Sequence, residues 1–113
     1  MTEDQLQAQF YQHVWNHYPQ LRRCIWSVPN GGSRHIMEAV KLKATGMLSG
    51  VWDLHVFYRG RFYIIETKVG RNSLSAAQQQ WRDIMLQQGA EAFVYRTLEE
   101  GIAIIEYIIN KHI

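Results

Sequence analysis

Apolar residues follow two kinds of pattern along this chain, a recurrence every three or four residues that is typical of helices and short runs that are typical of strands. Between Glu3 and His17, apolar side chains recur at every fourth position, which places them on one face of a helix. Thr2 can cap this helix, and Gln5, three residues later, completes the pattern of a capping box. Pro19 lies just beyond the last turn, where it would stop the helix. The pattern therefore predicts a helix over residues 3–17.

The rest of the chain divides into short apolar runs, typical of strands, and further helical segments. Two more capping patterns, at Ser75 and at Thr97, each open a helix. The predicted elements after the first helix are strand Cys24–Val28, helix His35–Ala44, strands Trp52–Tyr58 and Arg61–Val69, a helix from Ser75 to Gly89, strand Ala92–Arg96, and a last helix with Leu98, Ile102, Ile105 and Ile109 on one side.

This order of elements predicts one α/β domain over residues 1–113, with a small mixed sheet flanked by helices. A hydrophobic content of 47% excludes a disordered chain. Trp15, Trp26 and Trp81 are expected in the core, and the single cysteine, Cys24, is expected to be a buried thiol. No apolar run approaches the roughly 18 residues of a membrane-spanning helix, and the N-terminus is acidic, unlike a secretory signal. We therefore expect a soluble, cytoplasmic protein.

Charged residues occupy the end of the predicted hairpin, where a buried sheet would be apolar. Glu66 and Lys68 are two apart, so their side chains leave the same face of a strand. If the hairpin folds at Arg59-Gly60, then Asp53, six residues before this turn, lies beside Glu66, six residues after it. Two carboxylates and one ammonium group are thus predicted to converge.

Such a cluster suits a divalent metal ion and phosphate chemistry. Carboxylates are hard ligands for Mg²⁺ or Mn²⁺, and the Thr67 carbonyl is a candidate third ligand. The metal would activate a water molecule, while Lys68 would orient it and stabilise the transition state. A simple salt bridge between strands is the alternative interpretation of Asp53, Glu66 and Lys68.

Charge is distributed unevenly, although the net charge is only +2. Residues 22–71 contain nine Lys or Arg and three acids, a balance of +6, and two of those acids are Asp53 and Glu66. The uneven distribution fits a face that binds a polyanion, and an ordinary solvated surface is the alternative.

A wider set of residues resembles the VRR-NUC branch of the PD-(D/E)xK nuclease superfamily. The resemblance covers most of the chain and departs from the superfamily pattern at Trp52, which stands where the proline before the aspartate would be. The matching residues are Asn30-Gly31-Gly32, Arg34, Lys43, Gly46, Gly50, Asp53, Ile65-Glu66-Thr67-Lys68, Ser75, Gln78 and Trp81.

The resemblance implies a restriction-endonuclease-like α-β-β-β-α-β core and assigns roles within it. Asp53 and Glu66 would be metal ligands and Lys68 the catalytic lysine. Gln78 would touch the site or the nucleic acid, in addition to its place in the capping box. Glu3 would complete the metal shell, with stabilisation of the helix N-terminus as its alternative role.

Five residues are expected to contact DNA, because they are basic or lie in the flexible glycine-containing loop. They are Asn30, Arg34, Lys41, Lys43 and Arg71. His55, two residues from Asp53 on the same strand face, is expected near the site in a role that the sequence leaves open.

The resemblance implies a Mg²⁺- or Mn²⁺-dependent endodeoxyribonuclease of phage or bacterial type. It would act as a homodimer on branched DNA such as four-way (Holliday) junctions, since two related strands are cut by two identical sites. Two other classes stay open. One is a catalytically inactive nucleic-acid-binding module, and the other is a metal-free structural domain.

Overall fold

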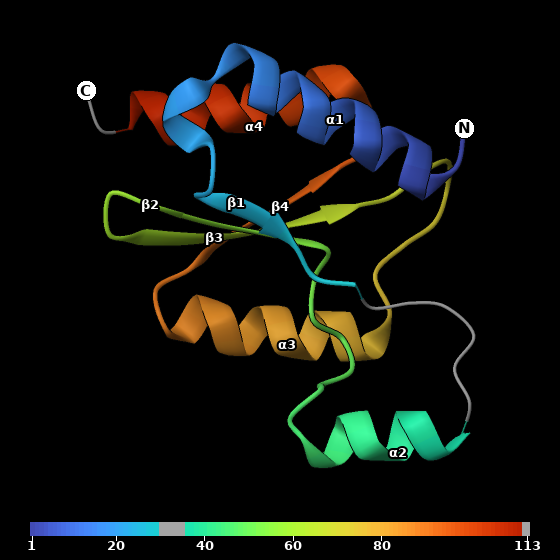
Figure 1. Ribbon diagram of the computed structural model, residues 1–113. Helices are drawn as coiled ribbons and strands as arrows, with labels where there is room; N and C mark the ends of the chain where they lie inside the picture. Colours follow the sequence, from blue (N-terminus) through green and yellow to red (C-terminus); the bar gives the residue numbers. More distant parts are fainter. Residues whose placement is uncertain (30–35, 112–113) are drawn as a thin grey trace.

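The computed structural model describes residues 1–29 and 36–111, and its elements follow the predicted order (Figure 1). The helices are α1 (Glu3–His17), the short 3₁₀ helix η1 (Pro19–Leu21), α2 (Ile36–Ala44), α3 (Ala76–Gln87) and α4 (Leu98–Asn110). The strands are β1 (Ile25–Ser27), β2 (Leu54–Tyr58), β3 (Arg61–Thr67) and β4 (Glu91–Tyr95). The predicted types are confirmed and the boundaries shift by one or two residues, while His35, the predicted start of α2, lies outside the described residues.

The four strands form one mixed sheet in the order β1-β2-β3-β4. Strands β1, β2 and β3 pair antiparallel, whereas β4 runs parallel to β3 after the chain crosses over through α3. The two-residue turn predicted at Arg59-Gly60 is confirmed, because Tyr58 pairs with Arg61 across it. At the other end of this hairpin Leu54 pairs with Ile65, so Asp53 and Glu66 follow as the next opposed positions.

Helices cover both faces of the sheet. Figure 1 shows α1 and α4 side by side on one face and α3 alone on the other. The core lies between the sheet and the α1–α4 pair, and burying its apolar side chains is the main stabilising contribution to the fold. Its fully buried members include Phe10, Leu21, Leu54, Val56, Tyr63, Ile65, Tyr95, Ile105 and Ile108.

The buried side of α4 differs from the prediction. The helix buries Gly101, Ile104, Ile105 and Ile108, whereas Leu98 and Ile109 are only partly buried against the core. The cause is the close approach of α4 to α1 at Gly101. A Cβ atom built on Gly101 would lie 2.6 Å from Phe10 Cδ1 and 3.3 Å from Tyr95 Cδ2. The helix therefore turns its glycine, rather than Ile102, toward α1.

Two of the three tryptophans predicted to be buried lie at the surface. Trp15 is 41% exposed on the outer side of α1, where the Arg22 guanidinium lies 5.2 Å from the ring centroid. Trp26 is 39% exposed, because it lies on the edge strand β1. Trp81 is half-buried beneath the sheet, and Cys24, predicted to be buried, is also half-buried.

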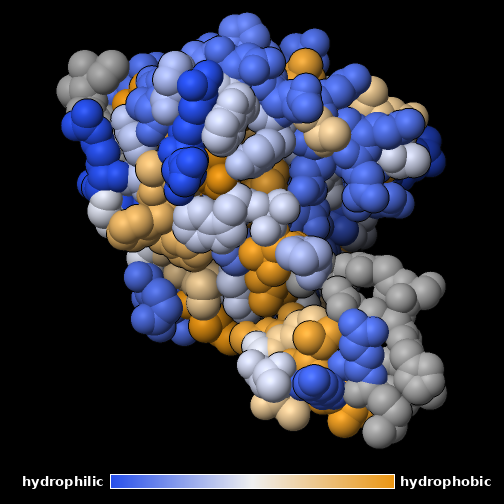
Figure 2. Space-filling model, in the orientation of Figure 1, coloured by the Kyte–Doolittle hydropathy of each residue, from blue (hydrophilic) through white to orange (hydrophobic). Residues whose placement is uncertain are grey.

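Helix α2 stands apart from the sheet on the α3 side (Figure 1). Figure 2 shows hydrophobic surface on this segment, where Val40, Met47 and Leu48 are exposed. Lys41 and Lys43 are exposed on the same helix. Among the described residues, no helix is long and apolar enough to cross a membrane.

The close approach at Gly101 leads to a stability prediction. Gly101→Ala should destabilise the protein by roughly 1–3 kcal/mol, because the added methyl group collides with the buried Phe10 ring. This loss should exceed the roughly 1 kcal/mol by which alanine favours a helix over glycine. Urea unfolding of the single variant and of Gly101→Ala in a Phe10→Leu background measures the effect. An equal cost in both backgrounds, or a stabilised single variant, would contradict the steric explanation.

Candidate metal and catalytic site

The Asp53 and Glu66 carboxylates meet at the open end of the β2–β3 hairpin. The Asp53 backbone N–H donates to Glu66 Oε1 at 3.0 Å, and the Thr67 backbone N–H donates to Asp53 Oδ2 at 3.3 Å. Each strand therefore orients the carboxylate of the other through a backbone donor. The predicted convergence of these two residues is confirmed by this pair of hydrogen bonds.

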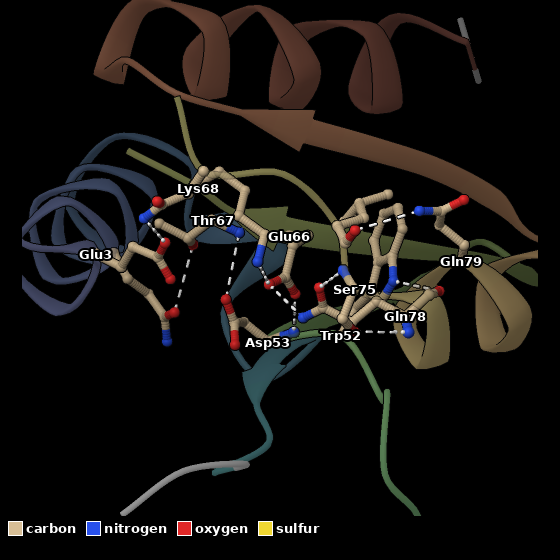
Figure 3. A network of polar contacts seen from close by, with 12 residues as sticks. Glu3, Trp52, Asp53, Glu66, Thr67, Lys68, Ser75, Gln78 and Gln79 are labelled. Atoms are coloured by element: carbon tan, nitrogen blue, oxygen red, sulfur yellow. Dashed lines mark hydrogen bonds and ion pairs between the residues drawn. The ribbon is translucent and has the colours of Figure 1, made fainter. Parts of the chain in front are cut away.

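Helix α3 fixes the second oxygen of Glu66. The capping box predicted at Ser75 and Gln78 is confirmed, and it places Gln78 in the first turn of the helix. From there Gln78 Nε2 donates to Glu66 Oε2 at 2.9 Å (Figure 3). Gln78 thus has both of its predicted contacts, the cap and the site.

The loop before Asp53 is anchored to the same helix end. The Trp52 indole N–H donates to the Gln78 carbonyl at 3.0 Å, and Trp52 is 1% exposed. Gly50 adopts φ +86°, and a Cβ atom there would lie 2.4 Å from the Ala77 carbonyl oxygen. Only glycine fits this close approach without displacing the backbone. Trp52, the residue before Asp53, thus has a structural role in anchoring this loop to α3.

Lys68 completes the charged group. Its Nζ lies 3.4 Å from Glu66 Oε2, and its backbone N–H donates to the Tyr95 carbonyl. Between these two residues, Thr67 is fully buried and its hydroxyl donates to Tyr95 Oη at 2.7 Å. The end of β3 is thus held to β4 on one side and faces β2 on the other. Lys68 is 8% exposed, so its charge lies in the site rather than in bulk water.

A cleft of about 570 Å³ opens beside these side chains, between α1 and the N-terminal end of α3. Figure 3 shows Asp53, Glu66 and Gln78 gathered there, with Glu3 on the α1 side of the network. Glu3 accepts a hydrogen bond from Asn72 Nδ2 at 3.2 Å. The cleft is lined by Glu3, Asp4, Gln7, Ser27, Val28, Pro29, Asp53, Glu66, Lys68 and Gln78.

Burial and like charge both act against ionisation of the two carboxyl groups. Burial, followed by the negative charge of Asp53, raises the pKa of Glu66 to about 7. Burial also raises the pKa of Asp53, and Glu3 adds to this rise, while the Thr67 N–H and Lys68 oppose it. The pair therefore disfavours carrying two negative charges unless positive charge is added.

The residues present fit a hard divalent cation. Two carboxylates with raised pKa values are held together in a cleft, and every ligand atom available there is an oxygen. Over the described ranges 1–29 and 36–111, no group of three His, Cys, Asp or Glu residues that could hold a metal ion is present. The ligand role of Glu3 therefore stays a prediction, as does that of the Thr67 carbonyl.

The predicted DNA contacts are spread over several parts of the chain. Asn30 and Arg34 lie outside the described residues, while Lys41 and Lys43 are exposed on α2. Arg71 is exposed in the loop that follows β3. Arg59, by contrast, forms the hairpin turn at the end of the sheet opposite to Asp53. The basic segment of residues 22–71 therefore does not gather as a whole around the site.

His55 has a structural position rather than a place in the cleft. It is 9% exposed and stacks on Trp81 with ring centroids 5.4 Å apart. Burial lowers the pKa of His55, and a hydrogen bond with the Trp52 backbone opposes this change. Its Nε2 atom is buried without a hydrogen-bond partner among the described residues. His55 thus supports the packing of α3 on the sheet.

Sequence reasoning missed Gln7 and Asn72. Gln7 lines the cleft, and its Oε1 lies 3.4 Å from the Thr67 hydroxyl. Its spacing of four residues from Glu3 on one helix face was the available signal. Asn72, in contrast, contacts Glu3 through a loop whose path only the folded chain reveals.

The raised pKa of Glu66 leads to a prediction for the metal-free protein. Its folded-state pKa of about 7 exceeds the ordinary value of 4.5, so its contribution to stability is complete below pH 4.5 and is lost as pH rises through 7. Asp53→Asn removes the like charge, which is the second cause of the raised pKa after burial, so the loss between pH 5 and 8 should shrink by an amount on the order of 1 kcal/mol. His55 titrates oppositely in both proteins, and its contribution cancels in the difference between them.

Urea unfolding in EDTA across pH 5–8 measures this difference, with Asp83→Asn as the control at an exposed carboxylate paired to Arg82. Equal pH profiles for wild type and Asp53→Asn would contradict the electrostatic coupling of Asp53 and Glu66. So would an equal flattening of the profile by Asp83→Asn.

Comparison with known proteins bears on the fold. At the level of sequence, no protein-family profile and no curated protein matches the chain. A solved structure described as a "VRR_NUC domain protein" matches it with a TM-score of 0.80 and 24% identity, over 97% of this chain and 89% of that chain. The restriction-endonuclease-like fold predicted from the sequence is confirmed by this likeness. The chain has the fold of a VRR-NUC domain.

Proposed function

We propose that this protein is a metal-dependent nuclease that hydrolyses phosphodiester bonds in DNA. The observation that carries the proposal is the convergence of Asp53, Glu66 and Lys68 at one end of the hairpin, beside an open cleft. A structural salt bridge alone would not need two opposed carboxylates with raised pKa values. The solved structure with the same fold, described as a VRR_NUC domain protein, supports a nuclease-type activity.

The proposed metal ligands are Asp53, Glu66 and the Thr67 carbonyl. The Thr67 N–H donates to Asp53, and the N–H and C=O of a strand residue point to the same side, so the carbonyl faces Asp53 as well. Glu3, in the first turn of α1, lines the same cleft and is the candidate that would complete the metal coordination shell. Mg²⁺ or Mn²⁺, when bound, would neutralise phosphate charge and lower the pKa of a coordinated water.

Lys68 and Gln78 act on either side of the carboxylates in this proposal. The Lys68 ammonium lies 3.4 Å from Glu66 and faces the cleft, where it would stabilise the charge that develops on the attacked phosphate. Gln78 holds Glu66 Oε2, and the Asp53 N–H holds Oε1, so both oxygens of Glu66 are oriented before substrate arrives. Hydrolysis adds water to phosphorus and breaks the P–O bond to one sugar, whose oxygen takes a proton.

The proposed substrate is branched DNA, such as a flap or a four-way junction, cut by a homodimer. Helix α2, which carries the exposed Lys41 and Lys43, stands apart from the sheet (Figure 1), where its lysines would meet a second duplex. Arg71 is exposed in the loop that leaves the site strand. Asn30 and Arg34 are proposed contacts on the basis of the sequence alone. A dimer with two identical sites would cut two related strands symmetrically.

Cleavage assays test the proposal directly. Purified protein is incubated with plasmid, linear, flap and four-way-junction DNA in Mg²⁺, Mn²⁺ or EDTA. We expect cleavage only with metal, and a loss of at least about 100-fold in the Lys68→Ala and Asp53→Ala variants. Lys111→Ala is the matched control. Lys111 is paired with Glu91, the first residue of β4, whereas the site strand β3 ends beside Tyr95, the last residue of β4.

Two results would contradict this function. If the wild type cut no DNA with any metal, the enzyme proposal would fail, and retained DNA binding would favour a binding module. If cleavage survived both Asp53→Ala and Lys68→Ala, the active site would lie elsewhere.

A further inference from the structure

The Glu3 carboxylate, on the α1 wall of the cleft, is held by the loop that follows β3. Asn72 Nδ2 donates to Glu3 Oε2 at 3.2 Å, and this bond joins residues 69 positions apart in the sequence. Figure 3 shows Glu3 on the side of the network that carries Thr67 and Lys68. Within residues 1–29 and 36–111, Glu3 Oε1 has no hydrogen-bond partner, so this oxygen stays available to the cleft that Glu3 lines.

A tight turn directs Asn72 back toward α1. The Asn72 backbone N–H donates to the Val69 carbonyl at 3.1 Å. Gly70, inside the turn, adopts φ +57°, a left-handed conformation that glycine takes without strain. Arg96, just after β4, fixes the turn, because its Nη1 donates to the Gly70 carbonyl at 3.1 Å. Asn72 therefore reaches Glu3 from a loop that is attached to both β3 and β4.

Glu3 acts electrostatically on the opposed carboxylates but does not share an ion with them directly. Burial raises the pKa of Asp53, and the negative charge of Glu3 adds to this rise. Over the described part of the chain, however, Glu3, Asp53 and Glu66 do not form a group of three that could hold one metal ion. Mg²⁺ usually keeps several of its water ligands in protein sites. A carboxylate at the position of Glu3 would therefore bind the ion through these waters.

Apart from Lys68, the side chains that hold the carboxylates of this cleft are neutral amides. Gln78 Nε2 donates to Glu66 Oε2 at 2.9 Å. Asn72 Nδ2 has the same relation to Glu3. An amide N–H orients a carboxylate without cancelling its charge, so the charge stays available to a cation. A lysine or arginine in the place of Asn72 would pair with Glu3 and compete with the metal ion.

We propose that Asn72 is a positioning residue, which holds the Glu3 carboxylate where it binds the water ligands of a metal ion at Asp53 and Glu66. This inference rests on the metal site of the proposed function. Glu3 is the first residue of α1, and fixing its long side chain costs conformational entropy. The bond from Asn72 restricts this side chain before the ion arrives, so the ion binds more tightly. Asn72 itself does not touch the ion.

Titration of Mn²⁺ into the metal-free protein, followed by the electron paramagnetic resonance signal of free Mn²⁺, tests the proposal without a cleavage assay. We expect Glu3→Gln to weaken Mn²⁺ binding about tenfold, since an outer partner of the metal site is lost. Asn72→Ala should weaken it about threefold, because the carboxylate is still present but has lost one exposed hydrogen bond. In the Glu3→Gln background, Asn72→Ala should have no further effect.

Asn16→Ala is the matched control. Asn16 is exposed near the other end of α1, and its replacement should leave Mn²⁺ binding unchanged. Cleavage gives a second readout. In Asn72→Ala the Mn²⁺ concentration for half of the maximal rate should rise about threefold, while the rate at saturating Mn²⁺ stays that of the wild type. A general distortion of the site would lower the rate at saturating Mn²⁺ as well.

Failure of this role and failure of the nuclease proposal give different results. Unchanged Mn²⁺ binding in Asn72→Ala or in Glu3→Gln would overturn the role of Asn72. An equal loss from Asn72→Ala in the wild-type and Glu3→Gln backgrounds would also overturn it, because Asn72 would then act without Glu3. Metal-dependent cleavage alongside either result would leave the nuclease function intact.

The opposite pattern separates the two proposals in the other direction. Mn²⁺ binding that responds to the variants as expected, without cleavage of any DNA, would overturn the nuclease function and support the role of Asn72. Absence of Mn²⁺ binding by the wild type would overturn both proposals.

Discussion

The site depends on the register that opposes Asp53 and Glu66 across the β2–β3 hairpin. Burial disfavours the charged form of both carboxyl groups and raises their pKa values, and the negative charge of Asp53 raises the pKa of Glu66 further. The fold tolerates this pair because each carboxylate accepts a backbone N–H from the opposite strand. A shift of one residue in the register would send every side chain of the strand to the other face and separate the pair. The turn at Arg59-Gly60 and the apolar core face together fix this register.

One face of the sheet forms the hydrophobic core, and the other face carries the candidate site. Strand residues such as Leu54 and Ile65 pack against α1 and α4 and stabilise the domain. The opposite face carries His55 under α3 and becomes charged at Glu66, where the first turn of α3 supplies Gln78. A helix N-terminus and two strand ends thus meet at one point. The apolar core on the α1–α4 side stabilises the fold, and this stabilisation offsets the cost of burying Asp53 and Glu66 at the other face.

Much of this arrangement could be predicted from the sequence, because local signals set it. The spacing of apolar residues, the capping patterns and the Arg59-Gly60 turn predicted the order of the helices and strands. Counting residues outward from that turn predicted that Asp53 lies opposite Glu66. Contacts between distant segments could not be predicted in this way. Hydrophobic residues alone do not show that Gly101 faces Phe10, and this contact rotates the buried side of α4. Nor does composition reveal that Trp26 falls on an edge strand, which is why it is exposed rather than in the core.

The central claim is that the opposed carboxylates form a divalent-metal site, and metal-dependent thermal stability tests it most directly. A cation that binds only the folded state raises Tm by an amount that grows with the logarithm of its concentration once this exceeds the dissociation constant. We predict that Mg²⁺ or Mn²⁺ raises the Tm of the wild type at pH 8 and leaves the Tm of the Asp53→Asn, Glu66→Gln double variant unchanged. The same rise in both proteins, or no rise in the wild type at millimolar metal, would contradict the account.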